Sequence, residues 1–169
     1  MQEHVVLVNE KDSPLGLMKK QEAHVKGLLH RAFSVFIFND KNETLLQQRA
    51  SEKYHSPLLW TNTCCSHPRD GETYLEGAQR RLQEEMGISC PLEKKFHFIY
   101  RADVGHNLIE HELDHVFIGY YNENPILNPK EVSNFKWLTI EEIQKELRVQ
   151  PKNYTEWFKI IFNEYLHRL

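Results

Sequence analysis

One amphipathic helix stands in the middle of the chain, with strands expected on either side of it, and it limits the folds available. Apolar residues recur at helical spacing across residues 73–86. Thr73 and Glu76 form the capping box that opens such a helix, and Gly87 suits the left-handed residue that ends it. A central helix between strands must cover a sheet, which indicates a layered fold.

The segments on either side of this helix are rich in β-branched and aromatic residues, with turn residues between them. The expected strands are residues 5–8, 32–38, 44–49, 95–102, 108–121 and 134–138. The polar turn 39–43 joins two of these into a predicted hairpin, and residues 50–60 read as a loop. Two further helices are expected, over residues 139–147 and 154–167. This order predicts a single α+β domain over residues 1–169, with a mixed sheet covered by helices.

Composition excludes several classes of protein. The chain has 169 residues and a formal net charge of −3, which argues against a strongly basic nucleic-acid-binding protein. The longest apolar run, residues 32–38, is far shorter than the roughly 20 residues that a membrane helix needs. The start of the chain lacks a secretory signal, and its three cysteines do not make a disulfide framework. We therefore expect a cytoplasmic protein with reduced thiols that binds neither nucleic acid nor membrane.

Ten histidines in one chain prompt a search for metal ligands. His24 and His30 lie on either side of Gly27, which discourages a long helix there. If these two side chains converge with His67, they supply three imidazoles suited to Zn, Mn or Fe. The alternative is three unrelated surface histidines.

A second pattern lies in residues 60–68, where Cys65 precedes His67 by two positions. A thiol this close to an imidazole can act as a nucleophile or base, or can form part of a metal site. The competing interpretation is a pair of small buried cysteines, Cys64 and Cys65, beside a surface histidine.

The acidic segment 110–115 can be interpreted as a strand or as a helix, and the two interpretations assign different residues as metal ligands. On a strand, Glu110, Glu112 and Asp114 share one face and can reach one cation. On a helix, His111 and His115 are the ligands of the H-E-x-x-H zinc peptidase pattern. The residues that follow are strongly β-forming and no capping residue opens a helix, so we favour the strand.

In this order and spacing the motifs resemble the type I isopentenyl-diphosphate isomerases, a family with a Nudix-like fold. The resemblance covers about residues 19–157, and its most specific parts are residues 27–34, 60–68, 100–102 and 110–112. It implies a reaction that moves the double bond of isopentenyl diphosphate to give dimethylallyl diphosphate. Such a reaction needs an acid on one side of the allylic system and a base on the other.

Residues 66–88 follow the Nudix pattern with two departures. Ser66 takes the place of the opening glycine, and Arg81 takes the place of a glutamate that helps to hold metal for diphosphate hydrolysis. The loss of that carboxylate argues for a scaffold that binds a diphosphate without cleaving it. Arg81 and Glu85 are also four residues apart on the predicted helix, a spacing that fits an ordinary surface ion pair.

The resemblance implies two metal ions. A divalent metal, Mn, Zn or Mg, is expected on His24, His30, His67, Glu110 and Glu112. His4 is the alternative for the first of these ligands. A Mg²⁺ ion that arrives with the diphosphate is expected on Glu85, and no flavin is expected.

The resemblance also implies the groups that touch the substrate. The diphosphate is expected on the basic residues Lys20, Arg49, Lys53 and Arg81. Proton transfer falls to Cys65, rather than Cys64, and to Glu112, with Tyr100 hydrogen-bonded near that carboxylate. Trp157 is expected to face the carbocation. The partner is thus a small molecule, bound by a monomer or weak dimer.

Three other functions stay open at this point. A Nudix diphosphate hydrolase is the main alternative, and Arg81 speaks against it. A zinc peptidase on His111 and His115 is the second, and a Nudix-like binding module without catalysis is the third.

Overall fold

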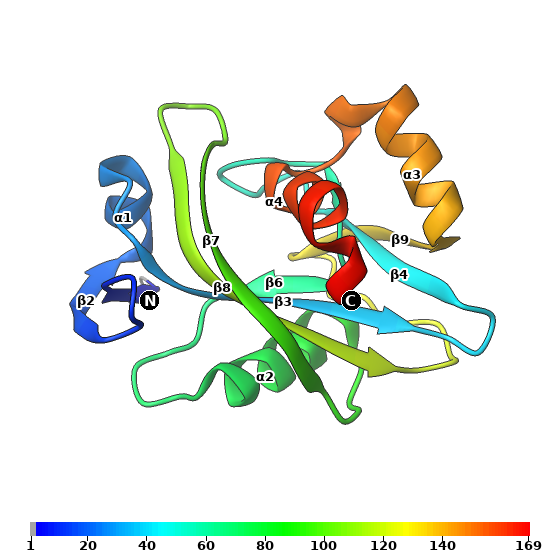
Figure 1. The fold of residues 1–169 in the computed structure, drawn as a ribbon, viewed down its shortest axis with the longest axis horizontal. Coiled ribbons are helices and arrows are strands. Elements are labelled where there is room, and N and C mark those ends of the chain that lie inside the picture. The colour runs from blue at the N-terminus through cyan, green and yellow to red at the C-terminus, as the bar shows by residue number, and fades with distance from the viewer. Residues whose placement is uncertain (1–2) are drawn as a thin grey trace.

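Helices cover both faces of a central mixed sheet in the computed structural model, which describes residues 3–169 (Figure 1). The strands are β1 (His4–Val8), β2 (Pro14–Lys19), β3 (His30–Phe38), β4 (Glu43–Arg49), β5 (Trp60–Thr61), β6 (Cys64–Ser66), β7 (Glu93–Asp103), β8 (Ile109–Tyr120) and β9 (Val132–Thr139). The helices are α1 (Lys20–Lys26), α2 (Tyr74–Met86), α3 (Ile140–Val149) and α4 (Glu156–Ile160). The predicted fold class, α+β with a mixed sheet under helices, is confirmed.

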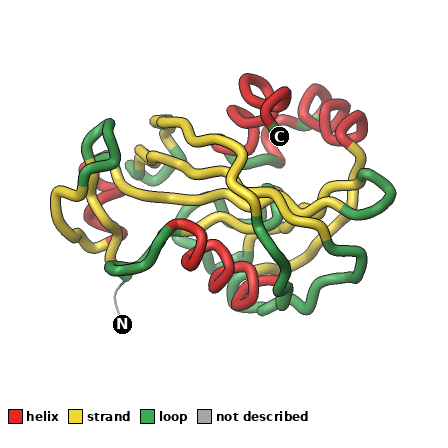
Figure 2. The backbone as a smooth tube through the Cα atoms, turned by 60° about the horizontal axis from the view of Figure 1, so that its bottom comes forward, coloured by secondary structure: helices red, strands yellow, loops and turns green. Residues whose placement is uncertain are grey.

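Strand β3 supplies the apolar layers on both faces, because successive side chains of a strand point to opposite sides. Phe33 and Ile37 pack in the cluster that holds Leu82 of α2. Phe36 packs on the other side, in the cluster that holds Phe158 of α4. Figure 2 shows α2 on one side of the sheet and α3 and α4 on the other. The sheet is therefore the middle layer of three.

Helix α2 begins and ends where the sequence predicts. The Thr73 side chain accepts a hydrogen bond from the Glu76 backbone, the reciprocal bond is also present, and Gly87 takes the left-handed conformation at φ 64°. Arg80 pairs with both carboxylate oxygens of Glu72, at 2.6 and 3.0 Å. This bidentate pair fastens the helix to the loop that follows β6.

The predicted hairpin of residues 32–38 and 44–49 is wrong in its pairing. Strands β3 and β4 share a single pair, Phe38 with Thr44, and then diverge. Along its length β4 pairs with β9 instead, and β3 pairs in parallel with β8. The hydroxyl of Thr63 lies in the gap, accepting from Ile37 N at 2.9 Å and donating to Leu45 O at 2.6 Å. The segment 60–66 is thus a wedge between the two strands.

Two short elements near the N-terminus were not predicted. Strand β2 pairs with β1, but its side chains are almost all exposed, so it carries no burial pattern in the sequence. Helix α1 has only seven residues and ends at Gly27, whose φ is 64°. The predicted C-terminal helix 154–167 starts two residues later, at α4, and continues as a π turn (Ile161–Tyr165) and a 3₁₀ turn (Leu166–Arg168).

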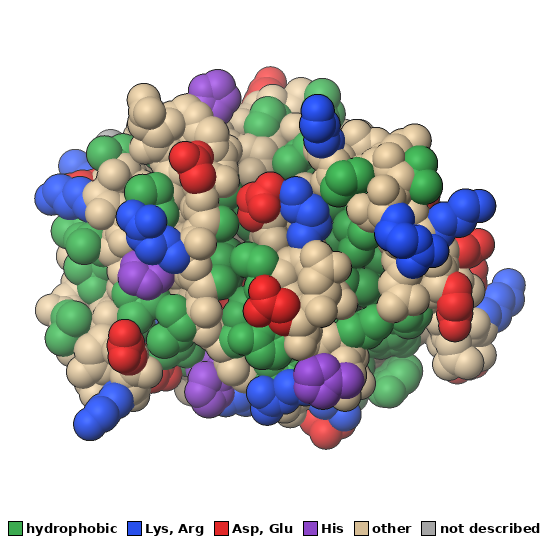
Figure 3. Space-filling model, turned by 45° about the horizontal axis from the view of Figure 1, so that its top comes forward, with side chains coloured by type: hydrophobic (Ala, Val, Ile, Leu, Met, Phe, Trp, Pro, Cys, Tyr) green, Lys and Arg blue, Asp and Glu red, His purple; other side chains and the backbone are tan. Residues whose placement is uncertain are grey.

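The surface seen in Figure 3 carries basic and acidic side chains interspersed among apolar ones. This mixture agrees with the small formal net charge of −3. Within residues 3–169, no helix combines the length and the apolar character needed to cross a membrane.

Close packing of α2 against β3 and against the loop that follows β6 rests on Gly77. A methyl group at this position would lie 3.1 Å from Pro68 Cα and 3.1 Å from the Phe33 ring. We expect Gly77→Val to lower the free energy of unfolding by about 1–3 kcal/mol, because the larger side chain overpacks this contact. Denaturant unfolding measures it. Gln83→Val, at an exposed position of the same helix, is the control and should cost only about 0.5 kcal/mol. Equal losses would contradict the packing argument.

Candidate metal centre and adjoining pocket

Five side chains from four parts of the chain converge on one point. His24 comes from α1, His30 from the start of β3, His67 from the position directly after β6, and Glu110 and Glu112 from β8. One ligand atom from each lies within 4.8 Å of all the others. The parallel pairing of β3 with β8, which sets His30 opposite Glu112, fixes the register of this group. His24, and not its alternative His4, belongs to it.

Segment 110–115 is part of strand β8, so the helical reading of a zinc peptidase is wrong. Glu110 and Glu112 are 3% and 7% exposed and point into the group. His111 points elsewhere, with Nδ1 3.0 Å from the Gly27 carbonyl oxygen. The ring of His115 stacks on Tyr74, with 3.5 Å between ring centroids.

The hydrogen bond of one imidazole leaves its other nitrogen free for a metal. His30 Nδ1 lies 2.8 Å from the Leu28 carbonyl oxygen, which only accepts, so this Nδ1 must carry the proton. Its Nε2 therefore presents a lone pair to the group, as metal-binding histidines do. His24 Nδ1 lies 2.6 Å from both the Lys20 carbonyl oxygen and the Tyr54 hydroxyl, and its Nε2 lies 2.8 Å from Glu110 Oε1.

Unpartnered polar atoms mark the centre of the group. Among the described residues, His30 Nε2 and Glu110 Oε2 are buried and have no hydrogen-bond partner. Leaving such an atom unsatisfied costs about 1–3 kcal/mol. A divalent cation between them would satisfy both atoms, and a donor set of imidazole nitrogens and carboxylate oxygens suits a transition metal. The residues present therefore fit a metal ion.

The protonation states of the group suit metal binding. Burial opposes the ionisation of Glu110, but the imidazoles of His24 and His55 outweigh it and hold its pKa well below the usual range. The pKa of Glu112 is also lowered, because His30 and His67 outweigh burial and the repulsion of Glu110. Burial lowers the pKa of His67 to about 4, so this imidazole is neutral at pH 7. Burial acts in the same direction on His30, but Glu112 and Glu110 outweigh it and raise the pKa of that imidazole. Ionised carboxylates and neutral imidazoles are the forms that bind metal, so a metal ion would compete with a proton at His30.

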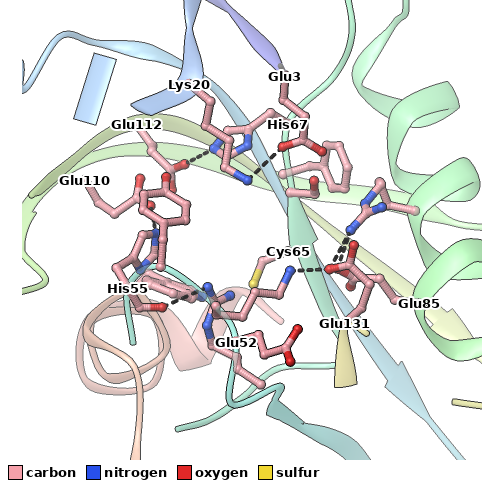
Figure 4. Close-up of a pocket in the computed structure, with 17 residues that line it drawn as sticks. Glu3, Lys20, Glu52, His55, Cys65, His67, Glu85, Glu110, Glu112 and Glu131 are labelled. Carbon is pink, nitrogen blue, oxygen red and sulfur yellow. Dashed lines mark hydrogen bonds and ion pairs between the residues drawn. The ribbon is translucent and has the colours of Figure 1, made fainter. Parts of the chain in front are cut away.

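A cavity of about 280 Å³ lies beside this group (Figure 4). It is lined by ten of the residues expected to act, namely Lys20, Arg49, Lys53, Cys65, His67, Arg81, Glu85, Glu110, Glu112 and Trp157. The other three, His24, His30 and Tyr100, are not among its lining residues. Figure 4 shows the sulfur of Cys65 near the middle of the ring of side chains.

Each basic residue of the cavity already has a partner. Lys20 Nζ lies 2.8 Å from Glu3 Oε2, and Lys53 pairs with Glu131. Arg81 Nη2 lies 2.7 Å from Glu85 and 3.2 Å from Glu131. The interpretation of Arg81 and Glu85 as a surface ion pair is therefore wrong, because both side chains are buried at the cavity wall.

The fourth basic residue, Arg49, is held by backbone rather than by a carboxylate. Its guanidinium donates to the carbonyl oxygens of Ser56 at 3.1 Å and His55 at 3.2 Å. The guanidinium carbon lies 5.3 Å from the centre of the Trp157 ring. Trp157 is 4% exposed, so the aromatic wall of the cavity is almost fully covered.

The two adjacent cysteines have different surroundings. Cys64 belongs to the apolar cluster under α2, whereas Cys65 faces the cavity. Burial raises the pKa of Cys65 to about 12, so the group is a thiol at neutral pH. Tyr100 donates a hydrogen bond to Glu112, and burial raises the pKa of this phenol well above its usual value.

Sequence reasoning missed several residues of the site. His55 contacts Glu110, Tyr54 contacts His24, and Glu131 contacts two of the basic residues. His55 and Tyr54 lie in the loop 50–60, which has no periodic pattern to single them out. The high histidine count was the one signal that could have drawn attention to His55.

Comparison with known protein families matches the NUDIX domain over residues 28–158. Among curated relatives, the isopentenyl-diphosphate Delta-isomerase of Pectobacterium atrosepticum is 53% identical, over 94% of this chain and 88% of the relative. Isopentenyl-diphosphate Delta-isomerase 2 of Photorhabdus laumondii is 52% identical, over 96% of this chain and 92% of the relative.

Solved structures share the fold at lower sequence identity. The crystal structure of DR0079 from Deinococcus radiodurans is 20% identical with a TM-score of 0.77, covering 96% of this chain and 99% of that one. The MutT protein of Methanosarcina mazei is also 20% identical, with a TM-score of 0.66, covering 80% of this chain and 91% of that one. These two likenesses concern the fold alone.

The geometry of β8 leads to a test that separates its two faces. Loss of a group that only supports a metal ligand weakens metal binding by about 10–100-fold. We expect Glu110→Gln, which changes an expected ligand itself, to weaken metal binding by at least this factor. His111→Ala and His115→Ala should keep their metal, because both side chains point away from the group. Elemental analysis of the purified variants decides the matter. Full metal in Glu110→Gln with none in His115→Ala would refute the site as described.

Proposed function

The chain belongs to the NUDIX domain family and, within it, to the isopentenyl-diphosphate Delta-isomerases, and we propose that its chemistry takes place in the cavity beside the His/Glu group. The protein interconverts isopentenyl diphosphate and dimethylallyl diphosphate. One observation carries the assignment of the site. Cys65 and Glu112 both line a cavity that basic side chains also line, so proton-transfer groups and anion-binding groups share one space.

Cys65 and the Glu112–Tyr100 pair are the two proton-transfer groups of this proposal. The reaction adds a proton to an unactivated alkene and removes one from the allylic carbon, through a state that resembles a tertiary carbocation. In the free enzyme the protons reside on the Cys65 thiol and the Tyr100 phenol, and Glu112 is ionised. We therefore assign protonation of the alkene to Cys65 or Tyr100, which are neutral in the free enzyme. We assign acceptance of the allylic proton to Glu112.

Trp157 stabilises the carbocation in this proposal. A cation against an aromatic face gains about 2 kcal/mol or more once water is excluded. The near-complete burial of the ring supports such exclusion, and water at the cation would trap it as an alcohol.

The His/Glu group would hold one divalent metal, Mn, Zn or Mg, through His24, His30, His67, Glu110 and Glu112. Such an ion would polarise and orient the groups around it when bound. Glu85 would contact the Mg²⁺ that accompanies the substrate. Lys20, Arg49, Lys53 and Arg81 bind the diphosphate, and three of them exchange a carboxylate for a phosphate oxygen as they do so.

The position of Arg81 weighs against a diphosphate hydrolase. Its guanidinium stands where the Nudix pattern has a metal-binding glutamate, and it pairs with Glu85 and Glu131. A cation in place of that glutamate removes one carboxylate ligand, which leaves the hydrolytic metal site incomplete. We further propose that the enzyme works in the cytoplasm, as a monomer or weak dimer.

A single incubation tests the function. Purified protein with isopentenyl diphosphate and Mg²⁺ should give dimethylallyl diphosphate until the two reach equilibrium, with no release of inorganic phosphate. Chromatography with mass detection resolves the two isomers. Phosphate release in place of isomerisation would identify a hydrolase, and retention of unchanged substrate would identify a binding module.

The two cysteines provide the sharpest mutational prediction. Cys65→Ala should lower kcat by about 10²–10⁴-fold, the usual contribution of a positioned acid or base. Cys64→Ala should keep most of the activity, since its side chain lies in the apolar cluster under α2, and should lose some stability. Steady-state kinetics and thermal unfolding of both variants measure these effects. Similar kcat values for the two variants would show that Cys65 transfers no proton.

A further inference from the structure

His55 is a fourth imidazole at the metal centre, although it lies outside the converging set. It is 3% exposed, and its Nε2 lies 2.8 Å from Glu110 Oε1. That same oxygen lies 2.8 Å from His24 Nε2. The five atoms that lie within 4.8 Å of one another include none from His55. His55 therefore contacts a ligand without sharing the position of the ligands.

The partner of Nε2 fixes the proton of His55. Glu110 Oε1, 2.8 Å from His55 Nε2, is a carboxylate oxygen and only accepts, so His55 carries its proton on Nε2 and donates it to Glu110. His55 Nδ1 then accepts from the hydroxyl of Ser56, at 3.1 Å. His30 differs, because its Nδ1 faces the Leu28 carbonyl oxygen and its Nε2 has no hydrogen-bond partner.

This donation leaves the other oxygen of Glu110 free. Oε2 is buried, has no hydrogen-bond partner among residues 3–169, and lies 3.8 Å from His30 Nε2. A carboxylate held at one oxygen by a fixed donor keeps the other oxygen in one orientation.

The backbone and ring of His55 also contact the substrate side of the cavity. Its carbonyl oxygen accepts from Arg49 Nη2 at 3.2 Å, and its ring meets Trp157 edge-on, at 89° and 5.9 Å between centroids. One residue thus joins the metal carboxylate, an expected diphosphate ligand and the aromatic wall.

We propose that His55 is a positioning residue of the metal centre, which orients Glu110 by donating Nε2–H to Oε1 and thereby tunes metal affinity. This inference rests on the proposed metal site of the isomerase. It assigns His55 no ligand bond to the metal and no contact with the reacting carbons.

Two amide variants test the donation. The amide nitrogen of His55→Gln comes close to the place of Nε2, whereas that of His55→Asn is one methylene too short. Metal-stripped protein is titrated with Mn²⁺, and the free ion is followed by electron paramagnetic resonance without substrate. We expect His55→Gln to bind Mn²⁺ within a few-fold of the parent protein and His55→Asn to bind it about 10–100-fold more weakly. His97→Asn, at an exposed position of β7, is the matched control and should bind as the parent does.

The other outcomes overturn the inference in distinct ways. Parent-like affinity in both variants would show that Glu110 needs no help from His55, and would leave the proposed function intact. Equal large losses in both would make the imidazole itself a ligand. Failure of the parent protein to bind Mn²⁺ would remove the metal centre together with this inference. Thermal unfolding in excess chelator separates loss of affinity from loss of fold.

Discussion

Two ionised carboxylates buried side by side on one strand are the constraint around which the site is built. Glu110 and Glu112 repel each other in a place where water cannot screen them, so the fold must surround them with compensating groups. Four imidazoles and one phenol lie against the two carboxylates, and they come from α1, from β3, from the loop after β4, from the residue after β6 and from β7. A divalent ion held by this group would complete the compensation.

Two features of the sheet bring those groups together. The parallel pairing of β3 with β8 sets one imidazole directly opposite one carboxylate. The wedge between β3 and β4, fixed by the Thr63 hydroxyl, delivers Cys65 and His67 from the same short segment. The spacing between the Cys65 sulfur and the His67 imidazole is therefore a property of backbone hydrogen bonds rather than of a mobile loop.

The parts of the fold that could be predicted are those with a period or a cap. Helix α2 has an apolar stripe, a capping box and a terminal glycine, and strand β8 has a β-forming run after its acidic half. The wedge could not be predicted, because the Thr63 hydroxyl takes the place of backbone hydrogen bonds between β3 and β4. Such a side-chain bond leaves no periodic pattern in the sequence. The five residues that converge in the His/Glu group were expected from the family resemblance, whereas His55 and Glu131 were missed. Both act through contacts to residues far away in the sequence, and single-residue patterns do not encode such contacts.

The lining of the cavity has a consequence for how an anion can enter it. Six carboxylates, those of Glu3, Glu52, Glu85, Glu110, Glu112 and Glu131, face four basic side chains. Without metal the cavity has an excess of two negative charges and repels a diphosphate, and one divalent ion brings it to balance. Long-range attraction then contributes little to the encounter, so the association rate should depend only weakly on ionic strength. Selectivity for the diphosphate would arise after contact, as its oxygens compete with resident carboxylates for the same cations.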